Sequence, residues 1–193
     1  NNNNNNNNHH HQQIHRLDQN IVLVTSGLIG DGRFLAGFLR RHCQEHRLTY
    51  GEPPTCDEIA RRASQLQHQL TTTRGYRPLG CYTLIAGISR QKQQQQQQQK
   101  IRLFLTEPGG GVEECSFAVL GKHSDPMLKF LNQRHQKDIT LEEATSTFLK
   151  SLDKYDHQCD VWLLSLNDTG NIDIICAKHA NQNTISQLAA HLQ

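Results

Sequence analysis

The chain has 193 residues, of which 35% are hydrophobic, and its 20 basic and 18 acidic residues leave a formal net charge of +2. This length and composition suit one globular domain, and the near balance of charge excludes a strong field toward nucleic acid or an anionic membrane surface. The 6 cysteines include no C-x-x-C pair, which indicates reduced thiols rather than a disulfide framework, and no apolar run approaches the roughly 18–20 residues of a membrane-spanning helix.

Residues 1–13 form a low-complexity tail of asparagine, histidine and glutamine. Such a polar tract cannot bury enough apolar surface to offset its ordering entropy, so we expect it to be disordered. Its three consecutive histidines have no fixed scaffold on which metal ligands could converge, so no metal site is predicted. The chain begins with Asn1 and its single methionine is Met127, which leads us to expect an N-terminally incomplete sequence.

A continuous apolar run, Ile21–Val24, leads through Thr25-Ser26-Gly27 into a segment with helical apolar spacing. The pattern predicts a buried strand, a tight turn and a one-faced helix whose apolar residues recur from Phe34 to about Arg47. A Pro-Pro break follows, after which Thr55 and Glu58 stand at capping-box spacing. A second helix is therefore predicted to begin there and to end near residues 71–75, which suggests a helix pair lying on a sheet.

The next predicted elements are strands at residues 81–88 and 101–106, joined by a polar loop that contains Gln93–Gln99. We interpret the glutamine tract as an insertion at a solvent-facing hairpin tip, where added residues cost little loop-closure entropy. A further strand is expected at Cys115–Leu120. Ser124-Asp125-Pro126 then predicts a helix start.

The C-terminal part carries a second capping box at residues 140–143, which predicts a helix over about 140–152. Apolar runs at residues 161–166 and 172–176 flank Asn-Asp-Thr-Gly, whose turn chemistry predicts a hairpin, and a short helix is expected over about 184–192. Strands interleaved with pairs of helices in this order fit a layered α+β fold.

Three motifs in this order resemble those of proteasome α-type subunits. They are Leu17–Arg33, which includes Thr25-Ser26-Gly27-Leu28 and Asp31-Gly32-Arg33, then Gly75–Gly80 with Arg77-Pro78-Leu79-Gly80, and then Glu107–Gly110. The similarity covers most of the chain from about Ile14 and weakens after Gly121.

The resemblance implies a four-layer αββα sandwich of the N-terminal nucleophile hydrolase type, in which two antiparallel sheets pack between helical layers. It implies a proteasome α-type domain over residues 14–193, with a glutamine-rich hairpin insertion at residues 91–100. The family's gate-forming tail, axial helix and first β-hairpin have no counterpart in this sequence. We therefore expect the sheet that contains Ile21–Val24 to expose an edge there.

The same fold serves threonine peptidases, whose nucleophile needs its own freed amino group as the base. Thr25 does not suit this role because apolar residues precede it in the same strand, and Thr71, Thr72 and Thr73 end a helical stripe. The α-type character of the motifs favours a chain without catalytic residues.

The resemblance also implies an activator-tail pocket between neighbouring ring subunits, to which Gly27 and Leu28 contribute. The family's pocket lysine falls at Gln13 by spacing, and a neutral amide cannot pair with a tail carboxylate as a cation does. Either this pocket is ineffective or the correspondence breaks down in the low-complexity start. Two family alanines are Gly30 and Gly32 here, a change expected to weaken the helix start by about 0.5–1 kcal/mol each.

The resemblance implies a divergent, N-terminally incomplete and non-catalytic structural subunit of the α ring of the 20S proteasome. Its expected roles are ring assembly, substrate gating and activator docking in ubiquitin-dependent protein degradation, in the cytoplasm and nucleus. Its expected partners are other proteasome α and β subunits and activators, with no cofactor, nucleic acid or membrane. The residues Asp31, Arg33, Arg77, Pro78 and Gly80 form the ring or fold motif. The alternatives are a β-type threonine peptidase subunit and a degenerate fragment without a role in assembly.

Overall fold

The computed structural model describes residues 13–93, 96–121, 124–134, 143, 159–166 and 172–180. The chain forms two compact units, the first from residues 1–98 and 102–116 and the second from residues 99–101 and 117–193. Each unit is described by itself.

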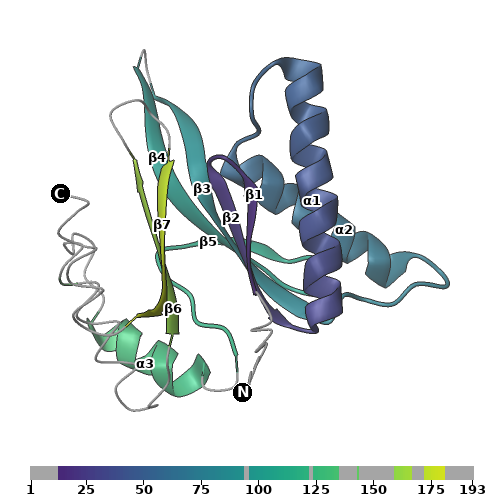
Figure 1. Cartoon of the computed structure of the whole chain (residues 1–193). Coiled ribbons are helices and arrows are strands. Elements are labelled where there is room, and N and C mark those ends of the chain that lie inside the picture. The colour runs from purple at the N-terminus through teal and green to yellow at the C-terminus, as the bar shows by residue number, and fades with distance from the viewer. Residues whose placement is uncertain are drawn as a thin grey trace, which may run out of the picture. The chain divides into compact units, whose positions relative to one another are not determined.

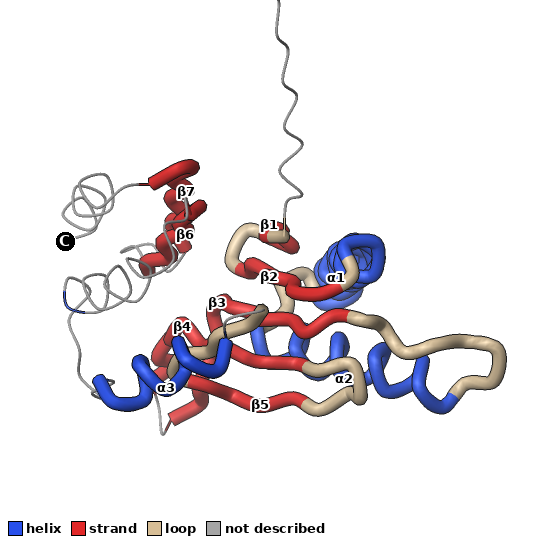
Figure 2. Tube along the Cα trace, turned by 90° about the horizontal axis from the view of Figure 1, so that it is seen from below, coloured by secondary structure: helices blue, strands red, loops and turns tan. Residues whose placement is uncertain are grey.

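The first unit is a five-stranded sheet with two helices on one face (Figures 1 and 2). Its elements are β1 (Ile14–Asp18), β2 (Ile21–Gly27), α1 (Ile29–Tyr50), α2 (Cys56–Thr72), β3 (Cys81–Gln93), β4 (Gln96–Thr106) and β5 (Val112–Cys115). The strands follow one another in the sheet in chain order, and the pairs β1/β2, β2/β3 and β4/β5 are antiparallel. The crossover from β2 to β3 carries both helices.

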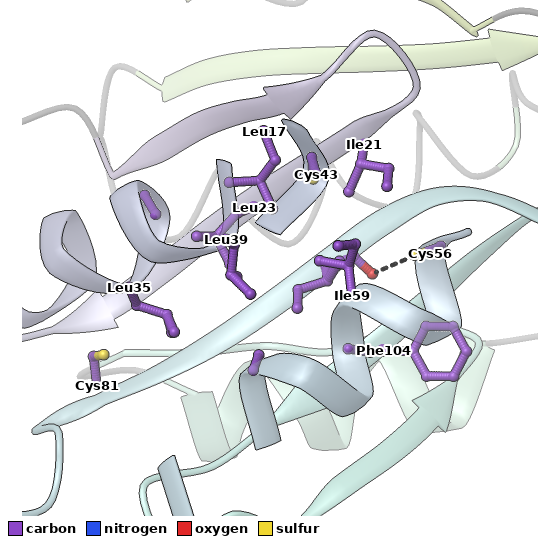
Figure 3. Close-up of a cluster of buried hydrophobic side chains, with 14 of the residues drawn as sticks. Leu17, Ile21, Leu23, Leu35, Leu39, Cys43, Cys56, Ile59, Cys81 and Phe104 are labelled. Atoms are coloured by element: carbon purple, nitrogen blue, oxygen red, sulfur yellow. Dashed lines mark hydrogen bonds between the residues drawn. The ribbon is translucent and has the colours of Figure 1, made fainter. Parts of the chain in front are cut away.

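The main hydrophobic core lies between this sheet and the two helices (Figure 3). On β2 and β3 it contains Leu23 and Ile85, which face each other in the strand register. On the helices it contains Leu35, Leu39 and Ile59, and all five side chains are fully buried. Burial of each such side chain stabilises the fold by about 1.5–3 kcal/mol. The predicted apolar faces of both helices are thus confirmed except at Phe34, which is 54% exposed.

Local signals set the ends of both helices, and those of α2 lie where the sequence predicts them. The Thr55 amide donates to Glu58 Oε2 at 2.7 Å, which completes the capping box at the start of α2. Helix α1 continues beyond Arg47 to Tyr50 and ends at Gly51, whose φ of 74° is the left-handed conformation common at helix ends. It also begins earlier than the apolar spacing suggested, at Ile29.

A buried polar network joins α2 to the sheet. The Thr106 hydroxyl donates to Gln67 Oε1 at 2.7 Å and lies 2.7 Å from the Thr83 hydroxyl, while Gln67 Nε2 donates to the Cys81 carbonyl at 3.2 Å. Gln67, Thr83 and Thr106 are all fully buried. Their mutual hydrogen bonds offset the cost of removing polar groups from water.

Three expectations about the first unit are wrong. Strand β1 pairs with β2, so Ile21–Val24 does not lie at the sheet edge. The glutamine tract is not a loop, because β3 continues to Gln93 and β4 begins at Gln96, and paired strands can extend their ladder through a polar sequence. The strand expected at Cys115–Leu120 instead spans Val112–Cys115, since the chain passes into the second unit at residue 117.

The second unit contains α3 (Ser124–Arg134), β6 (Cys159–Leu166) and β7 (Ile172–Ala180). The helix start at Ser124 is confirmed. The antiparallel pair β6/β7 confirms the two strands of the predicted hairpin, whereas its turn and the helices expected over 140–152 and 184–192 lie outside the described residues. None of the helices in the described ranges is long and apolar enough to cross a membrane.

Candidate functional site

The end of β2, the start of α1 and the segment before β3 meet at one point, which we call the Asp31 junction (Gly27, Leu28, Asp31, Arg77 and Gly80). The Leu28 amide donates to the Gly80 carbonyl at 2.8 Å, and the Leu28 carbonyl accepts the Gly32 amide at 3.0 Å as the first turn of α1 begins. The sequence motifs around residues 27 and 80 are therefore joined by their backbones.

Asp31 holds the junction together from the first turn of α1. The Arg77 guanidinium donates to both of its carboxylate oxygens, at 2.7 and 2.8 Å, and the Gly80 amide donates to Oδ2 at 2.7 Å. The Asp31 side chain is 12% exposed and that of Arg77 is 65% exposed. A paired fork of this kind fixes orientation as well as distance.

The environment of Asp31 favours its charged form. The hydrogen bond from Arg77 lowers the pKa of the carboxyl most, and the Gly80 amide and the Arg77 charge lower it further, while burial acts in the opposite direction. Its place in the first turn of a helix also suits a negative charge, because the helix dipole is positive there. The same pair raises the pKa of Arg77.

Two glycines let the backbones approach at the junction. Gly27 has a φ of 128°, and a Cβ there would lie 2.9 Å from Cys81 Cα and closer still to the Gly80 carbonyl oxygen. A Cβ on Gly80 would lie 2.7 Å from Leu28 Cδ1. A side chain at Gly27 would therefore displace the neighbouring backbone, whereas one at Gly80 would require the Leu28 side chain to move.

Gln13 lies beside Thr25 of β2, the strand that leads to the junction. Its carbonyl oxygen accepts hydrogen bonds from the Thr25 amide at 2.8 Å and the Thr25 hydroxyl at 3.3 Å. A Cβ on Gly32 would lie 2.7 Å from the same hydroxyl oxygen, so this glycine gives Thr25 its space. At Gly30, by contrast, a Cβ would meet nothing within 4 Å. The Thr25 side chain links β1, β2 and the start of α1.

The remaining motif residues lie around the junction rather than in it. Pro78 contributes its carbonyl, which accepts a bond from Arg77 at 2.9 Å. Arg33 is exposed on α1, and its charge, after burial and the Arg40 charge, helps lower the pKa of His15 on β1. The structure thus brings Gly27, Leu28, Asp31, Arg77 and Gly80 together. Arg33 lies on α1 outside this group.

The junction presents an apolar side chain at the surface. Leu28 is 57% exposed although its backbone is fixed at both its amide and its carbonyl, so an apolar side chain stands at the surface in a set position. Among the described residues no group of three or more histidine, cysteine, aspartate or glutamate side chains could hold a metal ion.

Sequence reasoning missed two contributors, Thr25 as a link and His15 as a buried base. From the sequence, Thr25 was a motif residue and an unsuitable nucleophile, yet the residue is 5% exposed and its hydroxyl donates to the Gln13 carbonyl. His15 is 8% exposed on the helix-facing side of β1. The available signal for this strand was weak, since only Leu17 is an apolar residue between polar neighbours, Arg16 and Asp18.

Comparison with known proteins places these features in a family. A family model described as "Proteasome subunit" matches residues 3–161. The "Proteasome subunit alpha" of Methanocaldococcus jannaschii is 29% identical over 162 residues, which cover 81% of this chain and 59% of that protein. That of Methanococcus maripaludis (strain C5) is 31% identical over 143 residues, covering 74% and 52%. "Proteasome subunit alpha type-7" of Caenorhabditis elegans is 30% identical over 135 residues, covering 70% and 51%.

The chain spans between half and three fifths of the length of these relatives. The match nevertheless includes all the described residues of the first unit, among them those of the Asp31 junction. Because the family model covers most of the chain and the relatives carry the α-type name, the chain belongs to the proteasome subunit family as an α-type subunit.

Proposed function

We propose that this chain is a non-catalytic structural subunit of the α ring of the 20S proteasome, and that the Asp31 junction forms one wall of a pocket for the C-terminal tails of activators. The exposed side chain of Leu28, fixed beside Gly80 at the end of β2, is the observation that carries this proposal. Similarity to α-type relatives supports assembly with other proteasome subunits.

The pocket has an apolar wall and a polar one. Leu28 supplies apolar contact, and Gln13 lies just before β1, where its carbonyl accepts a hydrogen bond from Thr25. The Gln13 side chain carries dipoles rather than a full positive charge. A tail carboxylate therefore gains a neutral hydrogen bond here and no ion pair, so this pocket binds tails more weakly than one with lysine.

The second face of the first unit's sheet suits the remaining layers of the αββα sandwich. Val24 and Leu84 face each other in the register and alternate with Leu23 and Ile85, which point to the helices. Val24 and Leu84 are only partly buried, and Val22 on the same side of β2 is 2% exposed. An apolar sheet face of this kind fits a second sheet.

In this proposal the subunit contributes to substrate gating and to ubiquitin-dependent degradation, in the cytoplasm and nucleus, together with α and β subunits and activators. The test of assembly is native purification of the tagged full chain from its own cells. We expect it to copurify with α and β subunits in a particle that hydrolyses a fluorogenic peptide. Microscopy of the same tagged chain checks the two compartments.

A peptide epoxyketone separates the alternatives, because it reacts with N-terminal threonines. We expect it to label other subunits of the purified particle and to leave this chain unlabelled. Labelling of this chain would establish a threonine peptidase subunit instead. Recovery of the chain only outside the particle would establish a fragment without a role in assembly.

The pocket itself is tested in assembled particles with an activator-tail peptide. Gln13→Lys is expected to strengthen binding roughly tenfold, since it restores an ion pair with the tail carboxylate. Gln19→Lys adds the same charge at an exposed turn residue just after β1 and serves as the control. Leu28→Asp is expected to abolish binding. Equal effects of the two lysine substitutions would contradict the pocket.

A further inference from the structure

Strands β3 and β4 continue past the rest of the sheet as a two-stranded arm (Figure 1). Strand β2 pairs with β3 only as far as the pair Ile21 and Gly87, and β5 pairs with β4 only over Leu103–Thr106. The glutamine-rich arm, residues 88–93 and 96–102, therefore lies beyond both neighbouring strands.

One edge of this arm pairs with none of the strands that the structure describes. The Ile88 amide donates to the Asn20 carbonyl at 3.3 Å, which shows that the polar backbone groups of Ile88 point to the β2 side. Because these groups alternate along a strand, those of Arg90 and Lys92 point to the same side. No described strand pairs with them there. Unpaired edge groups of this kind accept an added strand.

The positive charge of the arm favours pairing with an acidic strand. The sequence from residue 88 to residue 106 contains four basic residues and no acidic one. Arg102 is balanced by Glu114, to which it donates from two nitrogens, and it also donates to the Ser89 hydroxyl at 3.1 Å. By sequence, Arg90, Lys92 and Lys100 add three further positive charges to the arm. A second copy of the arm would bring like charges together, which disfavours pairing between copies.

We propose that the open edge of β3 at Arg90–Lys92 binds an extended acidic segment of a partner protein as an additional strand. Backbone hydrogen bonds to Arg90 and Lys92 would provide the affinity, and alternate glutamate or aspartate side chains would pair with the basic residues. This site lies away from the Asp31 junction and does not depend on the activator pocket.

The test uses the full chain and a fluorescent peptide of alternating glutamate and threonine, with binding followed by anisotropy. The double variant Arg90→Glu/Lys92→Glu is expected to weaken binding roughly tenfold or more. The matched control Arg74→Glu/Lys129→Glu changes the net charge equally at exposed residues elsewhere and is expected to leave binding unchanged. Thermal unfolding followed by circular dichroism verifies that each variant is folded.

A second pair of variants separates strand addition from simple attraction of charge. Lys92→Gln removes the charge and keeps the edge amide, whereas Lys92→Pro removes both, at an edge position that tolerates proline. We expect Lys92→Pro to bind roughly fivefold more weakly than Lys92→Gln, the effect of one hydrogen bond.

Four results would overturn the proposal. They are equal binding of a lysine-threonine peptide, equal binding by the two Lys92 variants, full competition by oligothymidylate, and a self-associated chain that the double arm variant converts to monomer. The third would identify a nucleic acid as the ligand, and the fourth would identify a second copy of this chain.

Discussion

Arg77 donates hydrogen bonds to both carboxylate oxygens of Asp31, a residue 46 positions earlier in the chain, at 2.7 and 2.8 Å. The same carboxylate accepts the Gly80 amide, so one side chain in the first turn of α1 sets the path of the segment that enters β3. The first motif supplies the carboxylate of this contact, and the motif at Gly75–Gly80 supplies its hydrogen-bond donors. The two motifs are therefore parts of one structural feature.

The first prediction concerns the shape of the Arg77 cation. Arg77→Lys keeps the charge but cannot make two parallel hydrogen bonds to Asp31, so the midpoint of thermal unfolding is expected to fall. Arg74→Lys, three residues earlier on an exposed side chain, is the matched control and is expected to leave the midpoint unchanged. Equal midpoints for all three proteins would show that the fork does not stabilise the fold.

The second prediction concerns acid. Burial, followed by the charges of Arg40 and Arg33, lowers the pKa of His15 from 6.5. The folded chain therefore binds fewer protons at this site than the unfolded chain, and stability falls as the pH drops below 6.5 toward the folded pKa. Urea unfolding of His15→Gln across this range should show a shallower decline than the unsubstituted chain.

Arg33→Gln provides the companion variant for that experiment, because it removes one of the two like charges near His15 without changing the histidine. Its decline with falling pH should lie between the other two. If His15→Gln and the unsubstituted chain lose stability in parallel, His15 is not the group responsible.

The third prediction compares two glycines. Gly27→Ala introduces a Cβ 2.9 Å from Cys81 Cα at a φ of 128°, and it should destabilise the fold by about 1–3 kcal/mol or prevent folding. Gly37→Ala lies in an open part of α1 and should stabilise it by roughly 0.5–1 kcal/mol. Chemical denaturation of both variants gives the comparison. Similar free energies of unfolding would contradict the close approach at Gly27.

The fourth prediction concerns the buried network of Thr106, Gln67 and Thr83. Thr106→Val removes the hydroxyl that bonds to both partners and leaves Gln67 Oε1 without that donor, which should cost about 1–3 kcal/mol. Thr49→Val, where the hydroxyl bonds to a helix carbonyl at an exposed site, is the control. If both variants lost the same free energy of unfolding in urea, burial of the Thr106 network would add no cost to the loss of a hydroxyl.

Elements with strong local signals could be predicted from the sequence. The capping box of Thr55 and Glu58, the apolar run at Ile21–Val24 and the helix start at Ser124 each depend on residues close together in the chain. Strand β1 was missed because it places His15 on the buried side while Ile14 remains partly exposed, which weakens the alternation expected of a strand.

The candidate site required information that no local pattern carries. The motif residues could be selected by resemblance, but the bonds from Leu28 to Gly80 and from Asp31 to Arg77 depend on how α1 and α2 fold back on the sheet. The strands in the glutamine tract could not be predicted from a local pattern either. Its strand state follows from pairing with a neighbour rather than from the preference of glutamine itself.

The hydrogen bond between Leu28 and Gly80 also bears on the order of folding. It closes a segment that contains the whole of α1 and α2, whose own contacts form locally and quickly. Pairing of β2 with β3 brings distant residues together and is the slower kind of event. During synthesis the two helices can therefore form before β3 has left the ribosome, while the closure at Leu28 must wait for it.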